Sequence, residues 1–263
     1  MNVDFHLHTS ASDGAHEPAR IAAAAAEARL VRWAITDHDS MAGWRTVAGA
    51  PGLVPGVEVT GQADDREIHV VGLGIDPDDA AFAAFLAAIR ATREQRMRAL
   101  MTRLGIAERI TLDELRVGAE SVGRNHLARA LVALGVATSF NDAFARHLGD
   151  EHLADTGLAP YPALADVCAA IRAARGVAIL AHPGIYVSRQ AVEALVAHGC
   201  DGLETAHPKL APSLAGELRQ MATRANLLQS CGSDLHVLGT RQPGEHRLSR
   251  AVLAPLIARL DAA

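Results

Sequence analysis

The chain has 263 residues and a formal net charge of −5, and 49% of its residues are hydrophobic while 21% are charged. This balance allows a full core and excludes a disordered chain, and the negative charge argues against a broad surface for duplex DNA. No run of about 18 apolar residues occurs and the first residues lack a signal-peptide pattern, so we expect a cytoplasmic protein with no membrane span. Cys168, Cys200 and Cys231 are widely spaced, which favours free thiols, whereas thirteen histidines against two tyrosines indicate metal binding.

The first predicted element is a buried strand over residues 3–7. His6 and His8 lie at its end, and because side chains alternate along a strand, both imidazoles should project from the same face. Asp13 adds a carboxylate in the loop that Gly14 closes. Imidazole and carboxylate groups on one face favour a first-row transition metal, although a His-x-His alone is equally consistent with an exposed edge strand.

The next 60 residues continue as an alternation of helices and strands. The predicted elements are a helix over 17–30 with Pro18 in its first turn, a strand over 33–36, a short helix over 41–48, and strands over 53–59 and 68–75 that are joined by a hairpin. Side chains with acid–base or metal-binding chemistry lie on or just after these strands, namely Asp37, His38, Asp39, Glu58 and His69. This placement indicates one shared site.

From residue 78 to residue 155 the pattern becomes entirely helical. The longest helix is expected over 79–104, where apolar residues recur at helical spacing. Its arginines are expected to form a solvated face: Arg90, Arg93, Arg96, Arg98 and Arg103. Three shorter helices should follow, over 112–117, 125–134 and 140–148. We interpret residues 78–155 as an inserted helical cap subdomain.

The alternation of helices and strands resumes in the last part of the chain. The predicted elements are a helix over 164–175, a strand over 177–180, a helix over 188–197 with Ser188 as its N-cap, a strand over 202–204, a helix over 213–225, a strand over 227–231 and a helix over 249–260. Polar residues again follow the strands: His182, His207, Asp234 and His236. In a parallel β/α barrel, the carboxyl ends of the strands converge on one mouth, where such side chains can hold more than one ion.

Six short motifs occur in order along the chain: His-Leu-His at 6–8, Ser-Asp-Gly at 12–14, Thr-Asp-His-Asp at 36–39, Gly-Val-Glu at 56–58, Ala-His-Pro at 181–183 and Gly-Ser-Asp-Leu-His at 232–236. They resemble the PHP family, the polymerase and histidinol phosphatase domain. The resemblance implies an α/β fold in which residues 1–77 and 156–263 form a distorted (β/α)7 barrel with a trinuclear metal centre. The implied ligands are His6, His8, Asp13, His38, Glu58, His69, His182, Asp234 and His236.

Two of these positions bear on the metals. By the resemblance, Glu58 would bridge two ions. Asp13 stands where many relatives carry histidine. Its carboxylate oxygen is a harder ligand than an imidazole nitrogen and should favour manganese, with iron and zinc as alternatives. We therefore expect two to three divalent ions, most of all manganese.

Residues 67–76, the long helix and residues 123–131 resemble one branch of this family, which includes 3',5'-nucleotide bisphosphate phosphatases and related 5'-to-3' exoribonucleases of the RNase AM type. In that branch the inserted domain supplies substrate-binding residues, and Arg124 matches one of them. Two segments depart from the branch: residues 149–153 lack its usual Gly-Lys-Pro, and residues 205–209 are altered. We expect a small phosphorylated substrate, a nucleotide or an RNA 5' end, and leave the oligomeric state open.

For such an enzyme we expect a hydroxide that bridges two metal ions to attack phosphorus in line, with Glu58 essential for catalysis. His207 is the candidate acid and a substrate contact, with a buried structural role as the alternative. Asp37, which we also assign to the catalytic site, and Asp39 should orient ligand histidines from the outer shell.

Two residues of the predicted cap are candidates for substrate binding. Arg124 would clamp a phosphate through its planar guanidinium, and His126 would stack on the substrate or hydrogen-bond it, although both are also ordinary residues at a helix start. Two other functions compete with a nucleotide phosphoesterase: a small-molecule phosphatase of the histidinol phosphate type and a non-catalytic metal-binding PHP module.

Overall fold

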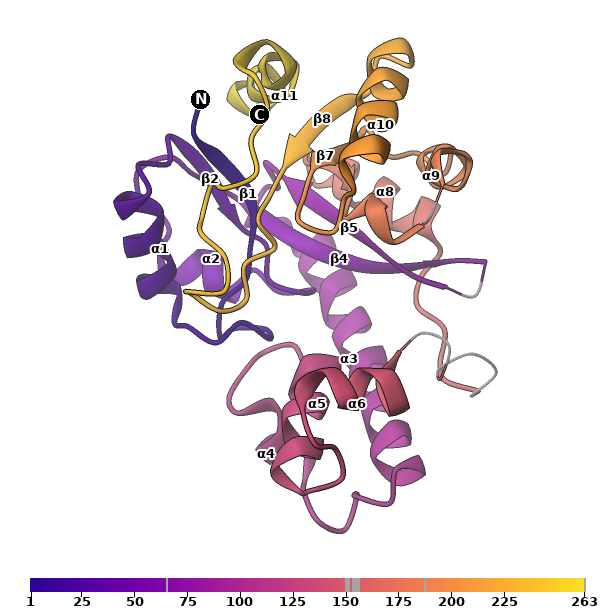
Figure 1. The fold of residues 1–263 in the computed structure, drawn as a ribbon. Helices are drawn as coiled ribbons and strands as arrows, with labels where there is room; N and C mark the ends of the chain where they lie inside the picture. The colour runs from indigo at the N-terminus through magenta and orange to yellow at the C-terminus, as the bar shows by residue number, and fades with distance from the viewer. Residues whose placement is uncertain (65, 150–151, 153–156, 187, 263) are drawn as a thin grey trace.

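Two β-sheets form the centre of the computed structural model, which describes residues 1–64, 66–149, 152, 157–186 and 188–262 (Figure 1). One sheet has the strand order β1-β2-β3, and the other has the order β4-β5-β6-β7-β8. The strands are β1 Val3–Leu7, β2 Arg32–Ile35, β3 Leu53–Val54, β4 Gly56–Ala63, β5 Arg66–Leu73, β6 Val177–Leu180, β7 Gly202–Ala206 and β8 Leu228–Cys231. All neighbouring strands are parallel except β4 with β5 and β5 with β6, which are antiparallel.

The strand predicted over residues 53–59 is divided between the two sheets. Leu53 and Val54 pair with β2, whereas Gly56 begins β4 and pairs with β5. Pro55 lies at the division, and proline has no backbone N–H to donate to a strand ladder. The predicted hairpin between β4 and β5 is confirmed with a shorter connection, since Ala63 pairs with Arg66, and Asp65 of its turn lies outside the described residues.

The two sheets meet at the ends that carry the polar motifs. Leu7 forms an isolated parallel bridge with Leu235, and His38 forms one with Glu58. A backbone hydrogen bond reinforces each bridge. The N–H of His8 donates to the Leu235 carbonyl at 3.0 Å, and the N–H of Asp39 donates to the Glu58 carbonyl at 2.9 Å. The ends of β1 and β2, the start of β4 and the loop after β8 are thereby held together.

Six helices cover the outer faces of the sheets: α1 Pro18–Glu27, α2 Ala42–Thr46, α8 Leu164–Ala173, α9 Arg189–Val196, α10 Pro212–Arg224 and α11 Arg250–Asp261. Val167 and Ile171 of α8 pack with Val59 and Val70 of the β4–β5 hairpin in one buried cluster. The predicted N-cap of α9 is confirmed, because the Ser188 side chain accepts a hydrogen bond from the N–H of Ala191.

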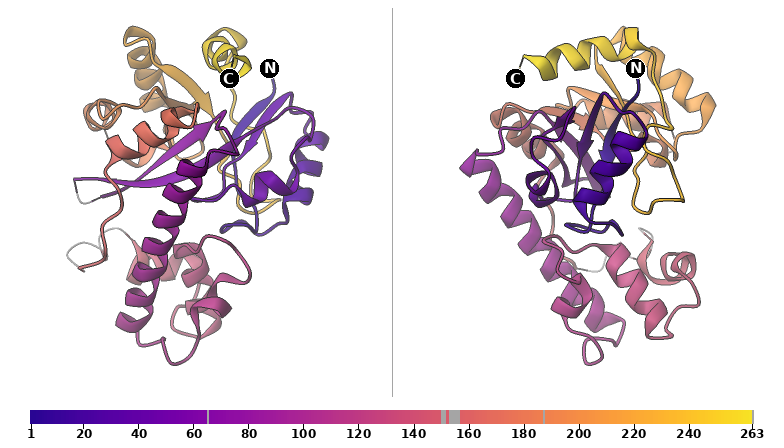
Figure 2. Two further views of the ribbon diagram at one scale, coloured as in Figure 1. Left: turned by 180° about the vertical axis from the view of Figure 1, so that it is seen from behind. Right: turned by 90° about the vertical axis from the view of Figure 1, so that its left-hand side faces the viewer.

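The short 3-10 helix η2 Pro183–Tyr186 follows β6. A further group of helices lies between β5 and α8 in sequence: α3 Ala80–Arg103, α4 Leu112–Arg116, α5 Arg124–Ala133, α6 Phe140–Ala143 and the π-helix η1 Phe144–Leu148. Figures 1 and 2 show α4, α5 and α6 grouped at the far end of α3, away from the strands. These helices share a core of their own, to which Leu100, Leu127 and Leu131 belong. The helix predicted over 140–148 is divided in the structure: α6 ends at Ala143, and η1 continues from Phe144 with π geometry. No helix in the described ranges is long and apolar enough to cross a membrane.

The prediction of a solvated arginine face on α3 is wrong for Arg93. Its side chain is only 6% exposed, and it forms an ion pair with Asp39 and donates to Thr60. Arg93 lies four residues from both Ile89 and Met97, which are buried, so it shares their face of the helix. Arg90 also turns inward, to the Asp39 carbonyl, and the Arg96 guanidinium lies 4.5 Å from the ring centroid of Tyr161. Helix α3 is thus tied to the polar ends of β2 and β4.

Candidate metal centre

The His-x-His pair at the end of β1 projects toward one point, as its spacing predicts. His6 and His8 are both fully buried, and their Nε2 atoms lie 3.1 Å apart. An exposed edge strand is therefore excluded for this motif. The apolar residues of β1, such as Phe5 and Leu7, pack into clusters on either side and fix the strand.

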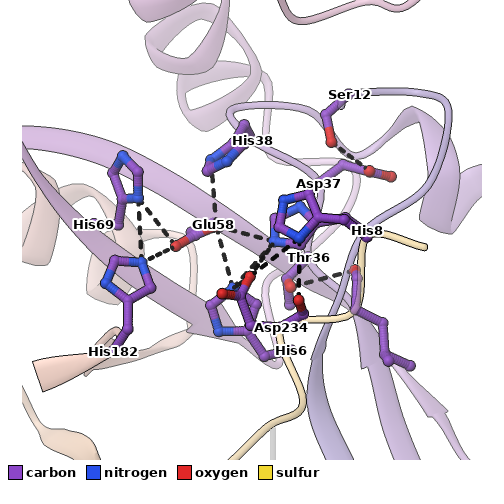
Figure 3. A network of polar contacts seen from close by, with 12 residues as sticks. His6, His8, Ser12, Thr36, Asp37, His38, Glu58, His69, His182 and Asp234 are labelled. Carbon is purple, nitrogen blue, oxygen red and sulfur yellow. Dashed lines mark hydrogen bonds and ion pairs between the residues drawn. The ribbon is translucent and has the colours of Figure 1, made fainter. Parts of the chain in front are cut away.

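Glu58 of β4 lies in the middle of the cluster (Figure 3). Its side chain is 1% exposed. The two carboxylate oxygens lie 2.9–3.2 Å from ring nitrogens of five histidines: His6, His8, His38, His69 and His182. His69 reaches Glu58 from the middle of β5 rather than from a strand's carboxyl end, because β5 runs antiparallel to both neighbours. A carboxylate in this position can contact two ions at once.

Asp13 and His236 close another side of the same cluster. Asp13 Oδ1 lies 3.3 Å from His236 Nε2, and its Oδ2 lies 3.7 Å from His38 Nε2. The helical block holds this carboxylate as well, since the Asn125 amide donates to Asp13 Oδ2 at 2.7 Å and Arg129 donates to the Asp13 carbonyl. Asp13 therefore links the loop after β1 to α5.

Asp234 has a different environment at each of its oxygens. Oδ1 faces the ring nitrogens of the cluster, at 3.4–3.7 Å from His6, His8 and His236. Oδ2 faces cationic or polar groups, with Lys209 Nζ at 3.2 Å and Arg241 Nη1 at 3.5 Å. The backbones of Asp234 and His182 have φ values of 49° and 32°, which are uncommon for residues other than glycine and recur at functional sites.

Among the residues that the structure describes, four buried or half-buried groups of side chains have the spacing of metal ligands: His8, Asp13, His38 and His236; His6, His8 and Glu58; His38, Glu58 and His69; and His6, Glu204 and His207. Their donor atoms are imidazole nitrogens and carboxylate oxygens, a set that suits manganese, iron or zinc. The Nδ1 atoms of His8 and His182 are buried and have no hydrogen-bond partner among the described residues. The residues therefore fit a cluster of first-row metal ions.

The pKa shifts keep the carboxylates of the cluster in the ionised form that binds cations. Burial alone would raise the pKa of the Glu58 carboxyl, but the surrounding histidines hold it well below its usual range, and the pKa values of Asp13 and Asp234 are lowered in the same way. Burial would lower the pKa of His8, yet neighbouring carboxylates raise it to about 10, and they raise that of His69 to about 9. Divalent ions require deprotonated ligands, so ions bound here would displace the histidine protons.

The two aspartates expected to orient histidines contact other groups. Asp37 accepts hydrogen bonds from the Thr9 N–H at 2.7 Å and from the Ser12 hydroxyl at 2.6 Å (Figure 3). Asp39 binds Thr60 and Arg93. Within the described ranges neither carboxylate has a hydrogen bond to a histidine, so that prediction is wrong. Their actual effect is to fix the loop after β1 and the inner face of α3.

Two other carboxylates, which none of the six sequence motifs includes, orient the histidines instead. Glu204 of β7 is 1% exposed and contacts His6 Nδ1 at 2.9 Å, while Glu67 of β5 contacts His69 Nε2 at 3.0 Å. Such contacts fix the ring and leave the other nitrogen facing the cluster. The signal for Glu67 was its place two residues before His69, on the same face of β5.

A cavity of about 370 Å³ opens onto the cluster. Its walls include Asp13, Glu58 and Asp234 from the cluster, and residues of the helical block and of the loop after β7: Arg124, Asn125, Phe140, Asn141, Phe144 and Lys209. Neither His126 nor His207 is among the described residues that line it. His126 Nδ1 accepts from the Gly123 N–H at 3.1 Å, and the His207 side chain is fully buried beside Glu204 and Asp234.

Comparison with known proteins places this site in a family. No family model matches the chain. It is 34% identical to the 5'-3' exoribonuclease Rnm of Escherichia coli, over 89% of this chain and 84% of that protein. It is 32% identical to the 3',5'-nucleoside bisphosphate phosphatase of Chromobacterium violaceum, over 90% of this chain and 88% of that protein.

Solved structures agree with this likeness. A protein of Bifidobacterium adolescentis assigned as a metal-dependent phosphoesterase superposes with a TM-score of 0.83 at 32% identity, over 98% of this chain and 96% of the other. The chain has the α/β fold of these phosphoesterases together with buried clusters of histidine and carboxylate side chains. It therefore belongs to the PHP family of metal-dependent phosphoesterases, hydrolases that act on phosphoric ester bonds.

Proposed function

We propose that the chain hydrolyses a phosphoric ester of a nucleotide, either the phosphate monoester of a 3',5'-nucleoside bisphosphate or the terminal phosphodiester bond at the 5' end of an RNA. The observation that carries this proposal is the single cavity that joins the histidine–carboxylate cluster to Arg124 and two phenylalanines. A nucleotide has the matching parts: one phosphate for the cluster, a second for the guanidinium and a base for the aromatic rings. The two relatives described above act on this class of substrate.

The proposed ligands of two to three ions, most of all manganese, are His6, His8, Asp13, His38, Glu58, His69, His182, Asp234 and His236. Bound divalent ions would supply a nucleophile at neutral pH by lowering the pKa of water and would neutralise charge on the phosphoryl oxygens. Glu58, whose two oxygens face different histidines, is the ligand placed to bridge ions. Glu204 and Glu67 hold the rings of His6 and His69 in the orientation that ligation requires.

The arrangement of elements also supports the architecture implied by the family resemblance. We assign residues 1–77 and 156–263 to a distorted (β/α)7 barrel, whose sheets meet through the bridges of Leu7 and His38. Residues 78–155 form the cap, an inserted all-helical subdomain with its own core and with Arg124 and Asn125 at the cavity. The end of this subdomain and most of the altered segment at 149–153 lie outside the described residues.

Arg124 is the proposed contact for the second phosphate. It begins α5, its side chain is 24% exposed, and one guanidinium nitrogen donates to the Leu148 carbonyl at 3.1 Å. Another nitrogen lies 3.7 Å from Glu67, so the guanidinium is held at the cavity wall beside the residue that orients His69. A guanidinium fixed in this way presents a planar fork to a phosphate.

Phe140 and Phe144 are the proposed contacts for the base. They line the cavity with ring centroids 5.2 Å apart, and Phe140 is 41% exposed, so its ring is accessible to a ligand. The Asn141 amide between them in sequence can hydrogen-bond a base edge. These rings favour a nucleotide over a phosphorylated amino alcohol, because aromatic stacking is effective with every nucleobase.

Replacing Phe140 by alanine is expected to raise KM for adenosine 3',5'-bisphosphate by roughly 5- to 150-fold, the range that follows from a stacking contribution of about 1–3 kcal/mol. KM for ribose 5-phosphate, which has no base, should not change. Steady-state kinetics on both substrates make the comparison, with Val132→Ala as the matched control, because Val132 is a partly exposed apolar residue of α5 away from the cavity. An equal effect on both substrates would remove Phe140 from the base site.

A hydrolysis screen with manganese, which measures the release of phosphate and of mononucleotides, tests the proposed function itself. The panel contains nucleoside 3',5'-bisphosphates, 5'-phosphorylated oligoribonucleotides and phosphorylated amino alcohols. We expect the highest kcat/KM with a member of the first two classes. A preference for the amino alcohols would instead assign the chain to the histidinol phosphate type.

A further inference from the structure

Lys209 is the only lysine in the chain of 263 residues, and it lines the cavity at the cluster. We propose that its ammonium group binds the phosphoryl group that is hydrolysed, and so acts on a different phosphate from Arg124. The inference rests on the proposed function, because it assumes that a phosphoester enters this cavity. It adds a substrate-binding residue from the loop between β7 and α10, outside the helical block.

The two carboxylate oxygens of Asp234 show how close Lys209 lies to the cluster. Asp234 Oδ1 faces the cluster histidines, and Oδ2 lies 3.2 Å from Lys209 Nζ. The ammonium is therefore separated from the cluster by a single carboxylate group. An ammonium has three N–H donors, and Asp234 is its only side-chain partner in the part of the chain that the structure describes. The other two donors can reach oxygens of a phosphoryl group held at the cluster.

The backbone of Lys209 is fixed, although its side chain is 46% exposed. Its N–H donates to His207 Nδ1 at 3.2 Å. A Cβ atom at Gly184 would lie 2.1 Å from the Lys209 carbonyl oxygen, so the loop is packed directly against the turn that follows His182. With a fixed backbone and a flexible side chain, Lys209 can keep its ammonium group near phosphoryl oxygens as they move during the reaction.

The other two groups near Asp234 Oδ2, Arg241 and His207, are not among the described residues that line the cavity. Arg241 donates to the carbonyls of Ser233 and Asp234 at 2.9 and 2.7 Å, so it holds the loop after β8. His207 is 3.6 Å from Oδ2 but is fully buried and does not line the cavity. Lys209 alone among these three combines contact with Asp234 and access to the cavity. A half-exposed ion pair contributes little to folding, so stability does not account for it.

Kinetics distinguish Lys209 from Arg124. Lys209→Ala is expected to lower kcat/KM by about 10- to 100-fold, the range for a hydrogen bond to a charged group. The loss should be equal for adenosine 3',5'-bisphosphate and p-nitrophenyl phosphate, because both carry the phosphoryl group that is hydrolysed. Arg224→Ala removes the same charge from an exposed site at the far end of α10 and should leave both rates unchanged. A loss confined to the bisphosphate, or no loss, would overturn the assignment.

Chemical labelling gives a readout that does not depend on activity. Because the chain has one lysine, acetylation by an N-hydroxysuccinimide ester modifies one ε-amine, and the N-terminal amine of Met1 is an internal control. Inorganic phosphate, added to the manganese-loaded protein, is expected to slow acetylation of Lys209 and leave that of Met1 unchanged, as measured by mass spectrometry. The same protection is expected in the Arg124→Ala variant.

The outcomes separate the two proposals. Acetylation of Lys209 at the same rate with and without phosphate, in a preparation that hydrolyses phosphoesters, would overturn the role of Lys209 and leave the proposed function standing. A preparation that hydrolyses none of the nucleotide substrates would overturn the proposed function. Protection by phosphate would then still decide whether Lys209 binds a phosphoryl group.

Discussion

Glu58→Gln is expected to lower kcat by several orders of magnitude while the fold stays intact. The Glu58 oxygens lie within 3.2 Å of ring nitrogens from five histidines, so this side chain holds the middle of the cluster. An amide has nearly the same shape but lacks the negative charge and one strong oxygen ligand, so it cannot bridge two cations in the same way. The measurements are kcat with a nucleotide bisphosphate, metal content, and the thermal unfolding midpoint as a check of folding.

Glu193→Gln is the matched control, because Glu193 is a half-exposed residue of α9 that pairs with Arg189 rather than with the cluster. It should retain the wild-type kcat. If Glu58→Gln keeps activity within about tenfold of the wild type, which corresponds to roughly 1.4 kcal/mol in the barrier, Glu58 does not bridge the ions.

Arg124→Ala is expected to weaken turnover of adenosine 3',5'-bisphosphate by about 1.5–3 kcal/mol in kcat/KM, the range for hydrogen bonds to charged groups. Turnover of p-nitrophenyl phosphate should barely change, because its only phosphate binds at the cluster. Arg124→Lys should not restore the rate fully, since an ammonium lacks the bidentate fork of the guanidinium. The measurement is kcat/KM of the three proteins on both substrates.

Arg98→Ala serves as the control for this series. Arg98 is an arginine of α3 whose side chain is 64% exposed, and it does not line the cavity. Equal losses on both substrates in Arg124→Ala would place Arg124 on the phosphoryl group that is hydrolysed. No loss on either would make it an ordinary charge at the start of α5.

Much of the candidate site was predictable because its information is local. His6 and His8 share a face through the two-residue period of a strand, and Asp234 and His236 directly follow β8. The motif order then predicted that these residues meet, and the structure brings all nine proposed ligands around Glu58 and Asp13. Most strand and helix bounds also agree within a few residues, since apolar periodicity sets them.

The parts that the sequence did not predict depend on packing between distant segments. Helical spacing places Arg93 on the same face of α3 as Ile89 and Met97, but its ion-pair partner Asp39 lies in a distant segment that spacing does not identify. Glu204 orients His6 across 198 positions, a contact that no spacing rule encodes. The predicted hairpin makes β5 antiparallel to β4, but the antiparallel pairing of β5 with β6 joins distant segments of the chain and was not predicted.

The metal content of the protein tests the central claim most directly. Protein purified after growth in medium with manganese or iron is expected to contain two or three transition-metal ions per chain by elemental analysis. Removal of these ions with a chelator should abolish phosphate release from adenosine 3',5'-bisphosphate, and manganese should restore it. A preparation that contains no metal ion after such growth, and that hydrolyses the bisphosphate at the same rate with and without the chelator, would contradict the account.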